Sequence, residues 1–359
     1  MGGIRPVVMS DADADVEETF ELITNNAVEA VTESELRELA ADPEGKRAYV
    51  GYEPSGVLHL GHMLTATKLM ELREAGFEVV VLLADVHARL NGKGTPAEIR
   101  ETAERMREQF VAFGLDPERT EFVHGSDFQL DKEYVLDQYE LAQGTTMKRA
   151  QRSMGEIAGD DAERVSHAVY PLMQALDIKH LNVDLAVGGM EQRKVHMLAR
   201  DVLPKIGEPA PTCLHTPLIA DLETGIGKMS SSDGVTISME DSREDIERKV
   251  EAGFCPPTAD PDPEDHLSED DLSEGVEVAD VTLENPVLQL FEFHVFPRFD
   301  AVTVEREERF GGDVTFESYA ALEAAVEAGD LHPDDCKTAL ADALDRLVEP
   351  GRRKLVTAD

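Results

Sequence analysis

Apolar strand patterns and helical patterns alternate along the first half of the chain. Short strands are predicted at Arg47–Tyr52, Phe77–Ala84 and Val183–Gly189, and the β-branched run of the second is typical of a strand buried on both faces of a parallel sheet. Their alternation with helices predicts a doubly wound α/β domain with a Rossmann-like parallel sheet. The predicted helices are Val16–Ala41, Gly61–Ala75, Pro96–Phe113, Asp131–Ile157, Arg164–Leu176 and Met190–Val202.

The pattern changes in the last third of the chain. Residues 256–285 contain eleven Asp and Glu and neither Lys nor Arg, which predicts a solvated linker or insert. Helical periodicity then returns. We therefore expect three parts: an α/β domain over residues 1–240 with a loose N-terminal tail and a helical insertion, an acidic linker or insert over 241–285, and a smaller α-helical domain over 286–359.

The charge of the chain is strongly negative. Lys and Arg number 34 and Asp and Glu 74, so the formal net charge is −40. At ordinary ionic strength this charge argues against a polyanionic partner. At ~1 M salt, however, the Debye length is only ~3 Å and such repulsion is screened. We therefore favour a protein from a halophile over an ordinary acidic protein.

The cysteines and the hydropathy indicate which metal sites, disulfides and membrane segments to expect. Cys213, Cys255 and Cys336 are far apart in sequence and form no C-x-x-C, so neither a metal knuckle nor a disulfide framework is expected. No apolar run is long enough to span a bilayer, and no secretion signal opens the chain. We expect a cytoplasmic protein without a membrane partner.

The sequence His59-Leu60-Gly61-His62 stands where the first predicted strand gives way to a helix. A helix N-terminus presents unpaired N–H groups to phosphate, and glycine allows a nucleotide to approach the backbone closely. Two imidazoles three residues apart share a helical face and can donate hydrogen bonds. Zinc binding is an alternative, although no third ligand is evident nearby, and two ordinary polar residues at a helix start are another.

A second segment, Thr224–Ser232, combines glycines, Lys228 and a run of serines. A lysine in such a loop supplies a mobile positive charge with hydroxyl donors behind it. The segment is not a Walker A loop, and the first is not a G-x-G-x-x-G fingerprint. Taken alone, this second segment could equally be a flexible surface loop.

The predicted helix around residues 166–178 suggests a polar pocket. Tyr170, Gln174 and Asp177 are four and three residues apart and share a face, while Asp177 is the only formally charged residue between His167 and Ile178. Buried polar groups need partners, and the phenol of a tyrosine ligand would fit this set. Tyr49 could add a second hydroxyl. The alternatives are a capping carboxylate for Asp177 and a core aromatic for Tyr49.

Taken together, the two segments resemble the paired motifs of class I aminoacyl-tRNA synthetases, with Lys228 169 positions after His59. The final Ser-Ser-Ser departs from the more common Lys-Ser ending. Within that class the chain resembles the tyrosyl-tRNA synthetases of archaea and eukaryotes from about Phe20 to Arg353. Four strings carry this likeness: RAYVGYEPSGVLHLGH, YPLMQALDI, VDLAVGGMEQRKVHMLAR and GKMSSSDG.

The resemblance implies an enzyme that activates L-tyrosine with ATP to tyrosyl-adenylate, releases pyrophosphate and transfers tyrosine to tRNA(Tyr). It implies ATP as its Mg²⁺ complex, no tightly bound protein-ligated metal, a homodimer and an anticodon-binding helical domain. The implied residues are His59, His62 and Lys228 in catalysis, Gly61, Lys228, Ser230 and Ser231 with ATP, Tyr49, Gly51, Glu53, Tyr170, Gln174, Asp177 and Gln192 with tyrosine, and Arg193, Lys194, Phe310, His332 and Asp335 with tRNA.

Three alternatives stay open. A tryptophanyl-tRNA synthetase shares the architecture, but the pair of Tyr49 and Asp177 favours a phenol over an indole, which can only donate. A small-molecule adenylyltransferase would not need the Lys228 motif together with a helical C-terminal domain. A non-catalytic tRNA-binding paralogue would be expected to lack a motif histidine or Lys228. The expected basic footprint for tRNA comprises Arg149, Arg152, Arg193, Arg352, Arg353 and Lys354.

Overall fold

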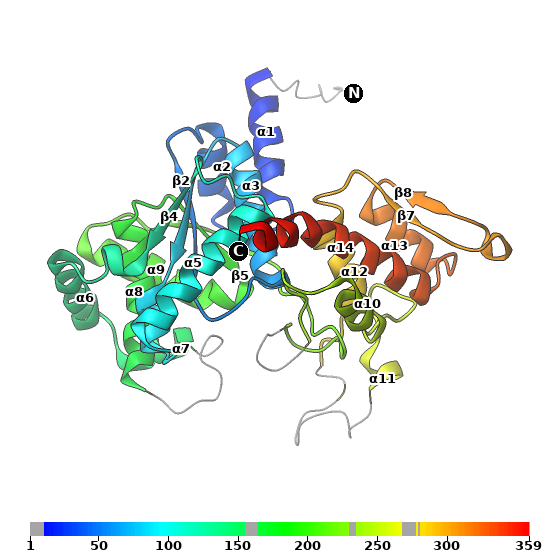
Figure 1. Ribbon diagram of the computed structural model, residues 1–359. Helices are drawn as coiled ribbons and strands as arrows, with labels where there is room; N and C mark the ends of the chain where they lie inside the picture. Colours follow the sequence, from blue (N-terminus) through cyan, green and yellow to red (C-terminus); the bar gives the residue numbers. More distant parts are fainter. Residues whose placement is uncertain (1–10, 155–163, 230–234, 268–277, 279–280, 359) are drawn as a thin grey trace, which may run out of the picture. The chain divides into compact units, whose positions relative to one another are not determined.

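The computed structural model describes residues 11–154, 164–229, 235–267, 278 and 281–358 (Figure 1). The chain folds into two compact units. The first comprises the residues up to 56 together with 65–107 and 115–217, and the second comprises 57–64, 108–114 and the residues from 218 onward. The functional boundaries expected at residues 240 and 285 stay predictions.

A six-stranded sheet forms the centre of the first unit, in the order β1-β6-β5-β2-β3-β4. Every pairing is parallel except that of β1 with β6. The predicted parallel α/β sheet is therefore confirmed. Its strands are β1 (Glu29–Val31), β2 (Arg47–Tyr52), β3 (Glu78–Leu83), β4 (Thr120–His124), β5 (Leu185–Gly189) and β6 (Thr212–Thr216).

The strand order reverses between β2 and β5. From β2 the chain continues through β3 and β4 on one side, whereas β5 and β6 lie on the other. In open parallel sheets such a reversal leaves a crevice at the carboxyl ends of the two strands, where ligands bind. Tyr49 of β2 pairs with Ala186 of β5 at this point.

Helices flank this sheet, and the first of them differs from the prediction (Figure 1). The single helix expected at Val16–Ala41 is wrong, because β1 separates two helices and Asn26 takes a positive φ of 53° before it. Thr32 and Glu35 then form a capping box that starts the second helix. The helices are α1 (Asp11–Thr24), α2 (Glu33–Ala41), α3 (Leu60–Glu74), α4 (Asp85–Leu90) and α5 (Pro96–Phe113), of which α3 and α5 contribute residues to both units.

The helical insertion of the first unit is also divided more finely than expected. The helix predicted over Asp131–Ile157 breaks at Thr145, and residues 155–157 lie outside the described part of the chain. The helix predicted from Met190 opens with a 3₁₀ turn. The elements are η1 (Gly125–Asp127), α6 (Lys132–Gly144), α7 (Met147–Met154), α8 (Val165–His180), η2 (Met190–Gln192), α9 (Arg193–Val202) and η3 (Leu203–Ile206).

The second unit is mostly helical, as the periodicity predicted, and α10 packs along α14. The range expected to be an acidic linker contains α10 and α11. A short hairpin of β7 and β8 was not predicted. The elements are α10 (Arg243–Glu251), α11 (Pro263–His266), α12 (Pro286–Leu290), the π-helical η6 (Phe291–Val295), β7 (Val302–Val304), η7 (Glu308–Phe310), β8 (Val314–Phe316), α13 (Tyr319–Glu327) and α14 (Pro333–Ala358).

Among the described helices, none combines the length and the apolar character that crossing a bilayer requires.

A buried ion pair joins α3 to the end of α1. The side chain of Lys68 is 1% exposed, and its Nζ lies 2.5 Å from Oε2 of Glu71. The same ammonium donates to the carbonyls of Ile23, at 3.1 Å, and Asn25. The amide of Asn25 in turn donates to Oε1 of Glu71 at 2.9 Å. Each polar group therefore has a partner, as a buried charge requires.

Replacing Lys68 by methionine leaves the Glu71 carboxylate buried beside Asn25 without its cation. We expect Lys68→Met to lower the free energy of unfolding by about 3 kcal/mol in denaturant titrations, because an uncompensated buried charge is costly. Adding Glu71→Gln should restore a large part of that loss. Arg100→Met, which breaks the exposed pair with Glu104, is the control and should change stability by less than about 1 kcal/mol. Equal losses of unfolding free energy in Lys68→Met and Arg100→Met would contradict this account.

Candidate active site

The carboxylate of Asp177 is the centre of a buried polar cluster beside the strand reversal. Asp177 lies on α8 and is 0% exposed. Its Oδ1 accepts hydrogen bonds from Nε2 of Gln129 at 2.7 Å and from the hydroxyl of Tyr134 at 2.8 Å. Burial outweighs these two bonds and raises the pKa of Asp177 to about 7.

The other oxygen of this carboxylate is open. Within the described residues, Oδ2 of Asp177 has no hydrogen-bond partner, and neither has Nε2 of His87, which lies 3.7 Å away. Burial lowers the pKa of His87 to about 4, so the ring is neutral at pH 7. An unpaired buried acceptor next to an unpaired buried ring nitrogen is suited to a ligand hydroxyl, which can donate to one and accept from the other.

Tyr49 borders the same cluster from β2. It is 2% exposed and shares the buried core with Met173 and Leu176 of α8. Burial, together with the charge of Asp177, raises the pKa of its phenol, so the hydroxyl stays protonated. Gly51 follows two residues later on β2, where an added Cβ would lie 3.7 Å from the Tyr49 ring.

Three members of this cluster were missed in the sequence. Gln129 follows η1, Tyr134 lies on α6 and His87 lies on α4, so their sequence separations from Asp177 are large. Nothing in the spacing of Gln129 and Tyr134 indicates a shared site. His87 did carry a signal, because it stands just after a predicted strand, at the carboxyl end where ligands of parallel sheets bind.

A second set of polar side chains lies along α8, with Gln174 about one turn and Tyr170 about two turns before Asp177. The hydroxyl of Tyr170 donates to Oε2 of Glu53 at 3.3 Å, and Nε2 of Gln174 donates to Oε1 of Gln192 at 3.1 Å. Burial raises the pKa of Glu53, while Lys93, whose Nζ is 3.8 Å from Oε1, opposes that shift. Oε1 of Gln174 is buried and lacks a partner among the described residues, so it can accept from a ligand ammonium.

All seven residues expected to bind tyrosine therefore lie in the first unit, and the contacts above link six of them to two clusters on α8. Gly61 and Lys228, which are expected to bind ATP, lie in the second unit.

The two motif histidines stand where α3 begins. The backbone from Leu58 to Leu60 pairs with residues 237–239, through Leu60 N to Ile237 O at 3.0 Å and Met239 N to Leu58 O at 2.8 Å. Gln109 accepts from Leu58 N at 2.9 Å and so fixes the turn from the other side. Backbone bonds to residues 237–239 and the Gln109 amide thus hold the turn that leads into the helix.

The imidazoles of His59 and His62 lie against each other, with ring centroids 3.9 Å apart. Nδ1 of His59 accepts from Gly61 N at 3.2 Å, and Nδ1 of His62 accepts from His59 N at 3.3 Å. These bonds leave each Nε2 protonated, so that it can donate. Burial lowers the pKa of His59 to about 4 and that of His62 well below its usual range, so both rings are neutral at pH 7.

Zinc does not fit this pair. In the described ranges, no group of three or more His, Cys, Asp or Glu side chains is arranged to hold a metal ion. The Nδ1 atoms of both rings are also occupied by backbone N–H groups. The geometry matches hydrogen-bond donation to phosphate oxygens instead.

The second motif begins in the same unit. Gly225 and Gly227 both have a φ of 70°, and Met229 N donates to Ile219 O at 2.7 Å. Lys228, which lies between Gly227 and Met229, is exposed. Ser230 and Ser231, expected to bind ATP, lie outside the described residues.

The residues expected at the acceptor end of tRNA belong to a basic pocket of the first unit. Arg193 opens α9 and forms a bidentate pair with Glu29, with Nε–Oε2 and Nη2–Oε1 distances of 2.7 and 2.8 Å. This pair holds the pKa of Glu29 below its usual value. Lys194 is exposed beside it. The pocket, about 500 Å³ in volume, is lined by Thr146, Lys148, Arg149, Arg152, Ser153, Arg193, Lys194, Met197, Leu198 and Asp201.

The residues expected to read the anticodon lie in the second unit. Phe310 of η7 is 59% exposed, and the guanidinium of Arg309 lies 4.6 Å from its ring centre. His332 is exposed and precedes α14, and Asp335 lies in the first turn of that helix. An exposed aromatic with an arginine on its face is suited to stacking on a base.

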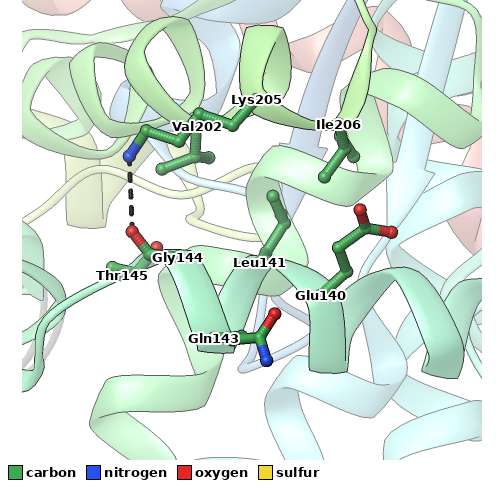
Figure 2. A pocket seen from close by; sticks show the side chains of 8 residues that line it. All are labelled: Glu140, Leu141, Gln143, Gly144, Thr145, Val202, Lys205 and Ile206. Carbon is green, nitrogen blue, oxygen red and sulfur yellow. Dashed lines mark hydrogen bonds between the residues drawn. The ribbon is translucent and has the colours of Figure 1, made fainter.

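A second pocket, of about 210 Å³, lies between the end of α6 and η3 (Figure 2). Lys205 closes one side by donating to the carbonyl of Gly144 at 3.4 Å. Its lining includes Leu141, Val202 and Ile206 and contains none of the expected site residues. We therefore assign it no part in the active site.

Known proteins of one family resemble this chain over most of its length. The family profile described as tRNA synthetases class I (W and Y) matches residues 43–349. The tyrosine–tRNA ligase of Halorubrum lacusprofundi is 65% identical, covering 94% of this chain and 99% of that protein. The tyrosine–tRNA ligase of Halobacterium salinarum is 60% identical, covering 94% and 97%.

A solved structure agrees with these relatives. The crystal structure of tyrosyl-tRNA synthetase from Archaeoglobus fulgidus, complexed with L-tyrosine, is 49% identical and superimposes with a TM-score of 0.85. The match covers 95% of this chain and all of that one. Fold, motifs and whole-length identity agree: the chain belongs to the class I tRNA synthetases of the tryptophan and tyrosine group, and within it to the tyrosine–tRNA ligases.

Proposed function

We propose that this protein activates L-tyrosine with ATP and transfers it to tRNA(Tyr). The observation that carries the proposal is the open Oδ2 of Asp177 facing Nε2 of His87 in a buried cluster. The phenol O–H of tyrosine can donate to this oxygen, and its oxygen can accept from Nε2 of His87 and from the hydroxyl of Tyr49. An indole N–H cannot accept, so the site favours tyrosine over tryptophan.

At the other end of the amino acid, the ammonium group requires acceptors. Gln174 offers its unpaired Oε1, and Glu53 offers a carboxylate already bonded to Tyr170. The bond from Gln174 to Gln192 fixes the amide so that its oxygen stays available. We propose that Tyr170, Gln174 and Gln192 hold the ammonium and that Gly51 and Glu53 line the site.

In the first reaction step, a carboxylate oxygen of tyrosine attacks the α-phosphorus of ATP and pyrophosphate leaves. Such a step depends on positioning and on stabilising developing charge. We propose that His59 and His62 donate hydrogen bonds from neutral rings to the phosphate oxygens, and that Gly61 leaves room for the nucleotide. Lys228 supplies the positive charge, together with Ser230 and Ser231. Mg²⁺ would enter with ATP, held mainly by phosphate oxygens.

In the second step, a hydroxyl of the terminal ribose attacks the tyrosyl carbonyl and AMP leaves. We propose that Arg193, Lys194 and the basic pocket around them receive the acceptor end of the tRNA, and that Phe310, His332 and Asp335 meet the anticodon. A positive pocket in a chain of net charge −40 supports a polyanionic ligand there.

We also propose that the protein is a homodimer. Leu130, Leu136, Tyr139 and Met147 are each more than half exposed, and Leu136 and Tyr139 share a face of α6. Large apolar side chains exposed on neighbouring segments are typical of a protein–protein interface. A second copy of the chain is the partner that the family resemblance implies.

Tyrosine-dependent pyrophosphate exchange in high KCl tests the assignment of substrate. We expect exchange with tyrosine and not with tryptophan, and we expect Asp177→Ala to lose tyrosine-dependent exchange while ATP still binds in equilibrium dialysis. Glu133→Gln, on the exposed face of α6, is the control and should retain exchange. Exchange with tryptophan alone, or an unchanged tyrosine rate in Asp177→Ala, would refute the proposal.

The raised pKa of Asp177 predicts a pH dependence for tyrosine binding. The ionised carboxylate accepts the phenol O–H, whereas the protonated form has lost that charge, so affinity falls as the pH drops below the pKa of about 7. We expect the KM for tyrosine to rise between about pH 8 and pH 6, by at most about tenfold for each unit below the pKa. Asp177→Asn should remove this dependence. A KM for tyrosine that does not change with pH in the unaltered protein would contradict this prediction.

A lysine proposed to contact tRNA should affect only the transfer step. We expect Lys194→Gln to raise the KM for tRNA and to reduce the salt slope of tRNA binding by about one, because one phosphate contact is lost. Lys132→Gln, exposed at the start of α6, is the matched control. Pyrophosphate exchange should be unchanged in both variants. An unaltered salt slope in Lys194→Gln would place this lysine outside the tRNA interface.

A further inference from the structure

The carboxylate of Glu29 lies between two partners in the first unit. On one side Arg193, which lines the basic pocket, donates to it from Nε and Nη2 at 2.7 and 2.8 Å. On the other side lies His215 of β6, whose Nδ1 is 3.0 Å from Oε2 of Glu29. The sheet fixes this arrangement, because Glu29 of β1 is directly opposite His215 in the antiparallel register and their side chains share a face.

His215 is close to Glu29 but is not hydrogen-bonded to it. Its side chain is 0% exposed, and its Nδ1 has no hydrogen-bond partner among the described residues, so this nitrogen and the carboxylate are not aligned. The other ring nitrogen, Nε2, lies 3.0 Å from Nδ1 of His196 on α9. A buried ring nitrogen beside a carboxylate that is bonded elsewhere is available to that carboxylate as a second partner.

Both imidazoles are neutral at pH 7. Burial lowers the pKa of His196 to about 3 and also lowers the pKa of His215. The negative charge of Glu29 opposes the shift at His215, and the positive charge of Arg193 adds to it. Moving Arg193 away from Glu29 would therefore raise the pKa of His215.

Few other titratable groups surround His215. The titratable and charged groups on the elements that face it are Glu29 of β1, Arg193 and His196 of α9, Glu191 of η2 and Cys213 of β6 itself. Burial raises the pKa of Cys213 to about 12, so it stays a neutral thiol, and the carboxylate of Glu191 turns toward the backbone of Gly189. The balance between Glu29 and Arg193 therefore sets the charge of the His215 ring.

We propose that Glu29 competes with RNA phosphate for Arg193 and changes partner when tRNA binds. Arg193 passes to a phosphate, and Glu29 pairs with His215, which becomes an imidazolium. This inference rests on the proposed binding of the tRNA acceptor end at the basic pocket. It makes Glu29 and His215 positioning residues, because both act through Arg193.

The exchange takes up one proton. In the free protein, Nδ1 of His215 carries the proton that faces the carboxylate, and Nε2 accepts from Nδ1 of His196. When tRNA binds, the proton of this bond passes to Nε2 of His215, and His196 takes a proton from solvent at its own Nε2. The imidazolium then replaces the guanidinium beside Glu29. Because this raises the pKa of His215 in the complex above that in the free protein, tRNA binding strengthens as the pH falls.

Calorimetric titration of the full-length protein with tRNA(Tyr) in high KCl, without tyrosine or ATP, tests the proton uptake. We expect the Kd for tRNA to fall between about pH 8 and pH 6, by at most about tenfold for each unit, the limit for one proton. Heats measured in two buffers of different ionisation enthalpy should show about one proton more taken up by the unaltered protein than by His215→Gln, whose amide can donate to Glu29 but cannot be protonated. Equal proton uptake by the two proteins would overturn the proposal.

The variant Glu29→Gln separates competition from support. We expect its Kd for tRNA at pH 8 to fall by about two- to fivefold, because Arg193 no longer has to leave a carboxylate, and its pH dependence to weaken. Glu33→Gln removes the same charge from an exposed pair with Arg37 and is the control, with little change in Kd expected. A Kd that rises or stays the same in Glu29→Gln would overturn the proposal.

Pyrophosphate exchange with tyrosine needs no tRNA and reports whether each variant is folded. We expect it to be unchanged in Glu29→Gln, Glu33→Gln and His215→Gln. Should His215→Gln lose exchange through misfolding, the Kd of Glu29→Gln still decides the proposal. Failure of the unaltered protein to bind tRNA(Tyr) at any of these pH values would instead overturn the proposed function.

Discussion

The fully buried carboxylate of Asp177 is the constraint on which the amino-acid site depends. A buried carboxyl must be neutralised or surrounded by donors. Here two donors, from α6 and from the segment after η1, reach the same oxygen, and the second oxygen stays open. The fold thus provides two hydrogen-bond donors for Oδ1 of Asp177 and leaves Oδ2 open to a ligand. In the proposed site this arrangement favours tyrosine, since a ligand without a hydroxyl would leave the second oxygen unpaired.

The excess of Asp and Glu in the chain also affects its basic surfaces. Four arginines of the expected tRNA footprint are held by carboxylates: Arg193 by Glu29, Arg149 by Asp201, Arg352 by Asp345 and Arg353 by Glu349. In the proposed complex with tRNA, RNA phosphates have to replace these acids. High salt weakens such partly exposed ion pairs and also screens the repulsion between the acidic surface and RNA. The identity to proteins of Halorubrum and Halobacterium agrees with an enzyme adapted to that condition.

Local patterns predicted the elements that carry the site better than the contacts that complete it. The strands β2 and β3 and the helix α8 were found from periodicity, and Tyr170, Gln174 and Asp177 share a face as expected. The break before β1 was missed because helix-forming residues on both sides concealed the turn signal of Asn25 and Asn26. Gln129 and Tyr134 were missed because their bonds to Asp177 join distant segments, and no short pattern encodes such a bond.

The neutral imidazoles at the start of α3 have a consequence for nucleotide binding at high salt concentration. A helix N-terminus with two permanently charged rings would attract chloride, which at molar concentration would compete with every incoming nucleotide. Rings whose pKa lies far below neutrality offer N–H groups without a standing charge. Such donors discriminate by geometry and by the charge that the ligand itself brings, so a polyphosphate can displace water while a halide ion gains little.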